Sequence, residues 1–266
     1  MQYPNIDPVA LSIGPVQLHW YGLMYVFAFA AGWLLGRWRA SRPWSKWKAE
    51  QVDDYVTWVM VGVILGARLG YVLFYDLPFY LSAPLEMFKI WNGGMSFHGG
   101  LIGVVTMSWR WGRRNGMSLV DIRDFVAPLV PTGLLFGRIG NFINGELWGR
   151  VTDASIGMVF PHAGPLPRHP SQLYEAGLEG LLTFIILWIY SSKPRPRGSV
   201  AGLFAVLYSL SRMFVEFFRM PDAQLGYLFG GWLTMGQVLC LPLLAAGLWL
   251  MVRGRKIGFS AKSRWD

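Results

Sequence analysis

Charged side chains lie inside stretches of this chain that otherwise have the pattern of membrane-spanning helices. One stretch contains Tyr208, Arg212, Glu216 and Arg219. At about 100° per residue these four positions fall within an arc of about 80°, so one helix face presents a phenol, two guanidiniums and a carboxylate. Glu216 can pair with either arginine, at a spacing of four or three residues. Two arginines against one acid predict excess positive charge for an anion such as phosphate, although a salt bridge joining helices is the structural alternative.

A second constellation is the glycine-rich run from residue 137 to 149. Arg138 and Asn141 lie about 60° apart on one helical face. The neighbouring glycines permit close approach of another chain, and Asn144-Gly145 is a typical turn. An arginine inside a membrane costs roughly 2.5–3.5 kcal/mol, which favours a functional interpretation. The alternative is a basic anchor at the end of a helix.

The third constellation is His98, which is flanked by Gly93-Gly94 and Gly99-Gly100. A lone histidine is usually a hydrogen-bonded structural residue, but these glycines leave the backbone open to a ligand. Histidine is also the side chain best suited to move a proton near neutral pH. Tyr21 and Arg68 are weaker candidates: the first is consistent with an interfacial aromatic and the second with a buried pair. The segment His169–Glu175 is predicted to begin a helix with Ser171 as its cap and Glu175 in its first turn.

The helices that must position these residues are predicted from the length of the apolar stretches. Hydrophobic residues make up 53% of the 266 residues and charged ones 15%, against about 25% charged in soluble domains. A bilayer requires about 20 apolar residues per helix. The chain is therefore expected to be an all-α polytopic membrane protein with seven transmembrane helices, at about 17–37, 52–75, 95–111, 120–142, 175–191, 200–219 and 232–252. Pro128 and Pro131 predict a break, and Gly62, Gly66 and Gly70 predict close helix packing.

The positive charges follow the predicted topology. Most of the 24 Lys and Arg lie in every second loop and after the last span. The positive-inside rule then predicts the N-terminus outside and the C-terminus in the cytoplasm. The formal net charge of +9 is explained in this way and does not indicate nucleic acid.

The whole chain, 1–266, is expected to form a single integral membrane domain. Residues 143–174 form its longest loop and are predicted to make a small periplasmic head over the bundle. The beginning of the chain has no basic segment followed by a cleavage site, so we expect no removable signal peptide. Cys240 is expected to be a helix-packing residue, and His162 with His169 lack the second ligand pair that a metal site requires.

The motifs are similar to those of the bacterial phosphatidylglycerol:prolipoprotein diacylglyceryl transferases. The most specific is Gly137-Arg138-Ile139-Gly140-Asn141-Phe142-Ile143-Asn144-Gly145-Glu146-Leu147-Trp148-Gly149, and Gly94–Gly100, His169–Glu175 and Tyr208–Arg219 also match in order. The resemblance implies a multi-pass protein of the bacterial inner membrane. It implies catalytic roles for His98, Arg138, Tyr208, Arg212 and Glu216, and substrate-binding roles for Tyr21, Asn141, Glu146, Gly149 and Arg219.

The reaction that the resemblance implies moves the diacylglyceryl group of phosphatidylglycerol onto the lipobox cysteine of a prolipoprotein signal peptide. A thioether forms and glycerol 1-phosphate leaves. Arg138 and Arg212 are expected to stabilise the negative charge on the phosphate, with Glu216 orienting Arg212. A thiol has a pKa of roughly 8.5, so a base must help it ionise; His98 is the first candidate, with Tyr208 or a carboxylate as alternatives. No metal or organic cofactor is expected, and the partners are the two substrates and the lipid bilayer.

Two other functions are compatible with a charged bundle interior. A phospholipid or anion transporter also lines its pathway with ionisable residues and makes no covalent product. A scaffold that only holds a signal helix would use the arginines to join its own helices.

Overall fold

Helices dominate the computed structural model, which describes residues 1–14, 16–221 and 226–257. In chain order the elements are β1 (Val9–Ile13), β2 (Val16–His19), α1 (Trp20–Ala40), α2 (Ala49–Phe74), α3 (Leu77–Ser82), η1 (Pro84–Phe88), η2 (Ile90–Asn92), α4 (Phe97–Asn115), α5 (Leu119–Val126), α6 (Val130–Ile143), α7 (Ser171–Glu175), the π-helix η3 (Ala176–Leu182), α8 (Thr183–Tyr190), α9 (Ser199–Val215) and α10 (Met235–Ile257).

The chain divides into two compact units. The first unit contains Met1–Leu35 and the residues from Arg123 onwards, and the second contains Gly36–Ile122. Each unit brings together its own set of predicted functional residues.

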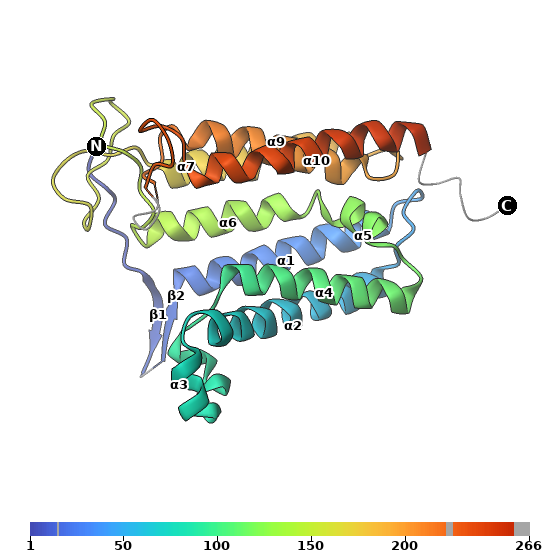
Figure 1. Ribbon diagram of the computed structural model, residues 1–266, viewed down its shortest axis with the longest axis horizontal. Coiled ribbons are helices and arrows are strands. Elements are labelled where there is room, and N and C mark those ends of the chain that lie inside the picture. Colours follow the sequence, from blue (N-terminus) through green and yellow to red (C-terminus); the bar gives the residue numbers. More distant parts are fainter. Residues whose placement is uncertain (15, 222–225, 258–266) are drawn as a thin grey trace. The chain divides into compact units, whose positions relative to one another are not determined.

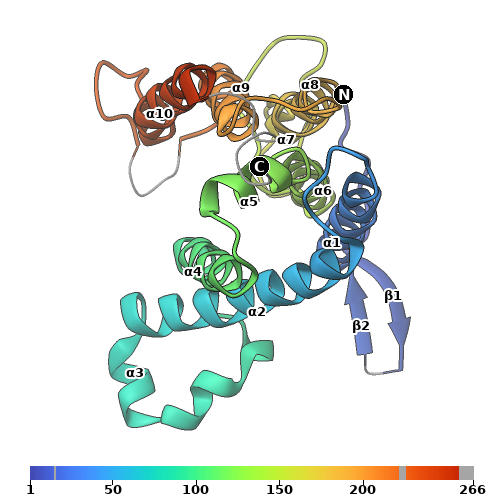
Figure 2. The same cartoon turned by 90° about the vertical axis from the view of Figure 1, so that its right-hand side faces the viewer.

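The first unit is organised by pairs of neighbouring helices. In Figures 1 and 2, α9 and α10 lie side by side, and α6 lies beside the continuous segment made by α7, η3 and α8. The α9–α10 contact is close: a Cβ added to Gly202 would lie 2.7 Å from the backbone oxygen of Gly247. Gly180 packs in the same way against the backbone of Leu135, which brings η3 onto α6.

The second unit is built on the pair formed by α2 and α4 (Figures 1 and 2). A Cβ on Gly62 would lie 2.8 Å from the oxygen of Gly103, and one on Gly70 would lie 2.7 Å from the Cα of Gly99. The predicted packing role of Gly62, Gly66 and Gly70 is therefore confirmed. Further along the same two helices, the hydroxyl of Tyr55 on α2 lies 2.9 Å from the hydroxyl of Ser108 on α4.

The predicted break at the prolines is also confirmed. Helix α5 ends at Val126 and α6 begins at Val130, with Pro131 in its first turn. A proline lacks the N–H that would continue the helix and its ring displaces the preceding turn, so two shorter helices replace one.

The N-terminal region departs from the purely helical prediction. Strands β1 and β2 form an antiparallel hairpin in which Val9 pairs with His19 and Ile13 with Val16. Helix α1 therefore begins at Trp20, three residues later than the predicted start of the first span at residue 17. The hairpin side chains of Leu11, Ile13 and Leu18 are exposed.

Three helices are long and apolar enough to cross a membrane among the described residues: Ala49–Phe74, Ser171–Tyr190 and Met235–Gly254. Ser199–Val215 is a shorter apolar helix. These lengths support the class of helical membrane protein that the composition indicates.

Candidate functional site

A network of ion pairs occupies the first unit, where α6, α7, η3 and α9 meet. The Nε atom of Arg138 lies 2.5 Å from Oε2 of Glu175. The same carboxylate oxygen lies 3.2 Å from Nη1 of Arg212, which is also 3.7 Å from Oε1 of Glu179. A single buried carboxylate thus links the two arginines that the sequence predicted for anion binding.

Glu216 extends this network toward the end of α9. Its Oε1 lies 2.6 Å from Nη2 of Arg212 and 3.5 Å from Nη1 of Arg219. Its other oxygen accepts a hydrogen bond of 2.7 Å from the hydroxyl of Thr234. Arg150 donates to the backbone oxygens of Glu216 and Arg219 at 3.0 Å, so it supplies positive charge at the helix C-terminus. Glu216 is held in place by both its side chain and its backbone.

The prediction of excess positive charge is wrong for this network. Three arginines face three carboxylates, because Glu175 and Glu179 join Glu216. Sequence reasoning missed these two acids because it treated Glu175 as a first-turn residue. The available signal was a pair of carboxylates four residues apart in an apolar span, which places both on one helix face.

The predicted cap of this helix is also wrong. Ser171 is the first residue of α7, and its hydroxyl donates a hydrogen bond of 3.0 Å to the backbone oxygen of Leu147. Glu175 is the last residue of α7 and is fully buried. Helix α7 therefore holds the 143–174 loop in place and positions Glu175 against the arginines.

The charges in the network are arranged by depth. The side chains of Arg138, Arg212 and Arg219 are 20%, 12% and 10% exposed. Those of Glu175, Glu179 and Glu216 are 0%, 0% and 1% exposed. The guanidiniums are therefore the more accessible charges of the network, and the carboxylates are the more deeply buried ones. Each guanidinium has five N–H donors, so donors can remain for a ligand after the ion pairs form.

A smaller polar group adjoins Arg138. Its Nη1 donates at 3.4 Å to Oδ1 of Asn141, and Nδ2 of Asn141 donates at 2.9 Å to Oε1 of Glu146. Tyr21 on α1 interacts with both Asn141 and Glu146. The side chain of Gln172 donates to the backbone oxygen of Glu146 at 2.5 Å. Residues far apart in the sequence thus connect into one polar network.

Gly149 lies where the loop meets the end of α9. It forms an isolated antiparallel bridge with Arg219, and its N–H donates to the backbone oxygen of His169 at 2.8 Å. A Cβ there would lie 2.5 Å from the backbone oxygen of Phe218 and 2.7 Å from that of His169. Only glycine fits, so this residue acts by letting the backbone approach Arg219.

Tyr208 lies one turn before Arg212 on α9. It interacts electrostatically with Glu179, Arg212 and Arg138, and its ring stacks on Phe204 with centroids 6.0 Å apart. The polar residues predicted for this segment therefore lie together, although α9 ends at Val215, and Arg212 contacts the carboxylates of Glu175 on α7 and Glu179 on η3.

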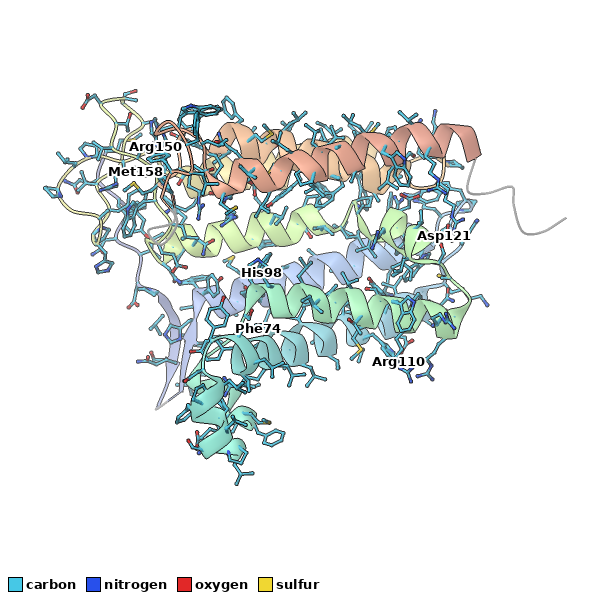
Figure 3. The ribbon with its side chains drawn as sticks, in the orientation of Figure 1. Phe74, His98, Arg110, Asp121, Arg150 and Met158 are labelled. Carbon is cyan, nitrogen blue, oxygen red and sulfur yellow. The ribbon has the colours of Figure 1, made fainter. Side chains whose placement is uncertain are left out.

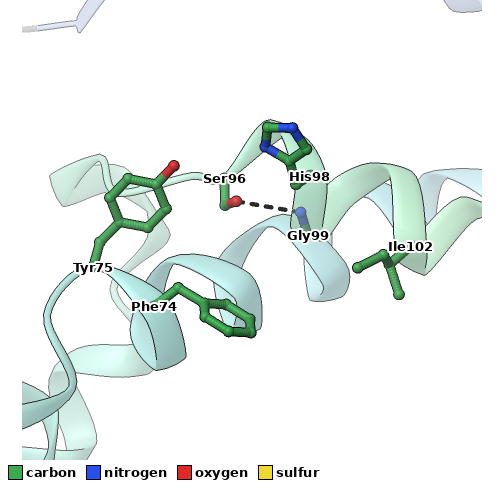
Figure 4. A pocket seen from close by; sticks show the side chains of 6 residues that line it. All are labelled: Phe74, Tyr75, Ser96, His98, Gly99 and Ile102. Carbon is green, nitrogen blue, oxygen red and sulfur yellow. Dashed lines mark hydrogen bonds between the residues drawn. The ribbon is translucent and has the colours of Figure 1, made fainter. Parts of the chain in front are cut away.

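His98 belongs to the second unit, near the start of α4, with Arg110 toward the other end of that helix (Figure 3). It lines a pocket of about 280 Å³ together with Phe74, Tyr75, Ser96, Gly99 and Ile102 (Figure 4). The hydroxyl of Ser96 accepts a hydrogen bond of 3.2 Å from the N–H of Gly99, which caps the helix.

Arg68 fixes the segment that precedes His98. Its guanidinium donates to five backbone oxygens: those of Glu86, Met87, Lys89, Gly93 and Gly94, at 2.5–3.3 Å. Gly93 and Gly94 have φ of 81° and 77°, a conformation that favours glycine. Arg68 is therefore a clamp for a folded backbone segment rather than a member of the ion network.

His169 lies in the 143–174 loop, and its Nδ1 is 3.0 Å from the hydroxyl of Tyr174. Burial lowers the pKa of His169 below its ordinary value of 6.5. No cluster of three or more His, Cys, Asp or Glu suited to a metal occurs within the described residues. Cys240 is buried in α10, as expected for a packing residue.

Apolar helices with a buried guanidinium–carboxylate network define a helical membrane protein with a charged interior. The sequence profile of the prolipoprotein diacylglyceryl transferases matches residues 8–253, and the chain belongs to this family. Three relatives are each named phosphatidylglycerol–prolipoprotein diacylglyceryl transferase. The protein from Nitratidesulfovibrio vulgaris strain DP4 is 62% identical over 98% of this chain and 99% of its own length. The protein from Oleidesulfovibrio alaskensis is 60% identical over 99% of this chain and 96% of its own length. The protein from Pseudomonas aeruginosa PAO1 is 58% identical over 95% of this chain and 95% of its own length.

Proposed function

We propose that this chain transfers the diacylglyceryl group of phosphatidylglycerol to the cysteine thiol of prolipoproteins. The sulfur attacks the glyceryl carbon that carries the phosphate, a C–S bond forms, and the C–O bond to phosphate breaks. The proton leaves the thiol through a base and ends on the released glycerol 1-phosphate. Family membership supports the reaction, and the single structural observation behind it is the layer of three arginines, two of them partly exposed, backed by buried carboxylates.

The arginine layer suits the charge change of this reaction. Negative charge grows on the phosphate oxygen as its bond to carbon breaks, and fixed donors stabilise that charge more strongly in a site with little water. We assign Arg138 and Arg212 to the phosphate because both are held by Glu175 and partly exposed. Glu216 then orients Arg212, and Arg219 completes the layer.

The remaining predicted residues divide between support and proton transfer. We propose that Asn141 and Glu146 keep Arg138 in place, with Tyr21 beside them. Gly149 keeps the loop against Arg219. We assign His98 to accept the thiol proton, because an imidazole lining a pocket is suited to that step near neutral pH. Tyr208 is the alternative proton acceptor on α9.

We propose seven spans in the bacterial inner membrane: α1, α2, α4, the α5–α6 pair, the continuous segment from α7 to α8, α9 and α10. The distribution of Lys and Arg supports an N-terminus in the periplasm and a C-terminus in the cytoplasm. Residues 143–174 would then be periplasmic and available to a signal peptide with its lipobox cysteine. Alkaline phosphatase fused after residue 160 should be active, whereas a fusion after residue 195 should be inactive; the reverse result contradicts the orientation.

Mass spectrometry of a lipobox peptide tests the transferase directly. The purified protein is incubated with phosphatidylglycerol and the peptide, and the peptide should gain one diacylglyceryl group. A peptide with serine in place of the lipobox cysteine should remain unmodified. Absence of the mass gain from a correctly folded preparation supports a transporter or a scaffold instead.

A further inference from the structure

Glu179 is a buried carboxylate that the proposed transfer does not use. It lies on the π-helix η3, and its side chain is 0% exposed. Neither of its oxygens accepts a hydrogen bond from any residue that the structure describes. Nη1 of Arg212 carries the opposite charge and lies 3.7 Å from Oε1 of Glu179. Buried carboxylates are normally hydrogen-bonded, and π-helical turns occur often at functional sites.

The charged and titratable groups that interact with Glu179 come from α6, α7, α10 and α9 with the turn after it. Glu175 on α7 repels its charge, and Arg138 on α6 with Arg212 and Arg219 at the end of α9 attract it. Tyr208 on α9 and Cys240 on α10 also interact with it. Glu175 accepts charged contacts from three arginines and Glu216 from two, which makes their protonation costly. Of the three carboxylates, Glu179 has the fewest contacts that stabilise its negative charge.

The balance of the network explains why such a group matters. Three arginines and three ionised carboxylates have a formal charge of zero. A phosphate diester brings one negative charge, and an uncompensated charge in a region of low dielectric constant is costly. Loss of one carboxylate charge restores neutrality. The cost of that loss is smallest at Glu179, because no hydrogen bond to its oxygens has to break.

We infer that the site takes up one proton with each anionic phosphate diester, and that Glu179 holds this proton. The inference rests on the proposed function, because it assumes that a phospholipid head group is the anion. The proton binds to a carboxylate oxygen of Glu179 as the phosphate reaches the arginines, and it leaves when the phosphate leaves. Glu179 thus keeps the network electrically neutral when the phosphate binds, and it need not touch the reacting atoms.

Titration calorimetry measures the proton count. Phosphatidylglycerol in detergent micelles is titrated into the wild-type protein in two buffers of equal pH and different ionisation enthalpy. The apparent binding heat should differ between the buffers by an amount equal to uptake of one proton per lipid. A heat that is independent of the buffer overturns the inference without any variant. Dimethyl phosphate, a diester with no group that titrates near neutral pH, is the second ligand: uptake with it assigns the effect to phosphate diesters in general, and uptake with the lipid alone assigns it to the lipid head group, either of which supports the inference.

Glu179→Gln removes the ionisable group and keeps its size. The variant should bind phosphatidylglycerol without proton uptake, and its affinity should not depend on pH. The wild-type affinity should fall about tenfold per pH unit once the empty site has lost its proton. Glu50→Gln, at an exposed carboxylate on α2, is the matched control and should keep the wild-type proton uptake. Uptake that persists in Glu179→Gln overturns the assignment to this residue.

Transfer to the lipobox peptide is measured on the same wild-type preparation. Wild-type transfer without proton uptake contradicts only the present inference. If wild-type protein binds the lipid but transfers nothing to the peptide, the proposed function fails instead.

Discussion

Nε of Arg138 and Oε2 of Glu175 lie 2.5 Å apart, although the two residues belong to separate helices, α6 and α7. The carboxylate is fully buried and also contacts Arg212 at 3.2 Å. Glu175 therefore fixes the separation between the two arginines that we assign to the phosphate. A residue without a proposed chemical step thus determines whether the two guanidiniums can act on one anion.

Glu175→Gln should be among the most damaging single changes in the first unit. The substitution leaves Arg138 and Arg212 without their shared counter-charge, and breaking a buried ion pair on one side costs about 3–5 kcal/mol. Thermal unfolding in detergent and transfer to a lipobox peptide should both decline. A glutamine variant with wild-type stability and wild-type transfer would show that the contact is dispensable.

Arg212→Ala should abolish lipid transfer while the protein still inserts into the membrane. Removing one donor from a developing negative charge typically lowers turnover about 10²–10³-fold. Arg212→Lys should recover little, because an ammonium cannot reproduce two guanidinium nitrogens that contact three carboxylates. Arg113→Ala, an exposed arginine on α4, is the control. Near-normal turnover of purified Arg212→Ala defeats the phosphate assignment.

The sequence predicted the arginines of this network and Glu216, but it missed two of the three acids. Arg212 lies on α9, which ends at Val215. Glu216 and Arg219 follow in the next turn, so their spacing of three or four residues still predicted that they would meet Arg212. Glu175 and Glu179 reach the same place through tertiary packing of η3 on α6 and α9, which periodicity within one segment does not specify. The sequence therefore predicted an excess of positive charge, whereas the structure has three arginines and three carboxylates in the network.

The prolines and glycines illustrate the complementary case, in which local chemistry was sufficient. Pro131 cannot continue a helix, so the break before α6 was predictable. Gly62 and Gly70 at small-residue spacing predicted the close α2–α4 pair. The β1–β2 hairpin was not predicted, since its strands are short and its apolar side chains are exposed.

Arg68→Lys should loosen the segment from Pro84 to Gly94. Arg68 supplies its guanidinium to five backbone oxygens, whereas a lysine ammonium has three donors. At least two carbonyls would lose their partner, at about 1–3 kcal/mol each where they remain buried. Limited proteolysis in detergent should cut this segment faster than in the wild type. Lys89→Ala, which removes only the partly exposed pair with Glu86, should leave the cleavage rate nearly unchanged.

Cys240→Ser should retain transfer activity. The thiol is buried in α10 and we assign the attacking sulfur to the substrate peptide. A serine hydroxyl within a helix can donate to the carbonyl four residues earlier, so the change should cost little. Initial rates with the lipobox peptide compare the two proteins. A folded Cys240→Ser protein without turnover would mean that this thiol takes part in the reaction.

His169 should make the protein less stable at acidic pH. Burial lowers the pKa of His169 in the folded protein below 6.5, while the unfolded chain keeps the ordinary value. Below pH 6.5 the unfolded state therefore binds a proton that the folded state does not. The stability contributed by the neutral imidazole is fully present above that pH and is lost as the pH falls through the folded pKa.

Thermal unfolding of the wild type and of His169→Gln, measured between pH 8 and pH 5, isolates this contribution from the other histidines. Glutamine can keep a hydrogen bond to the hydroxyl of Tyr174, which lies 3.0 Å from Nδ1 of His169. The wild type should lose more stability than the variant on acidification, so the difference between the two curves should change below pH 6.5 and stay constant above it. A difference that is the same at every pH would mean that His169 titrates alike in the folded and unfolded chains.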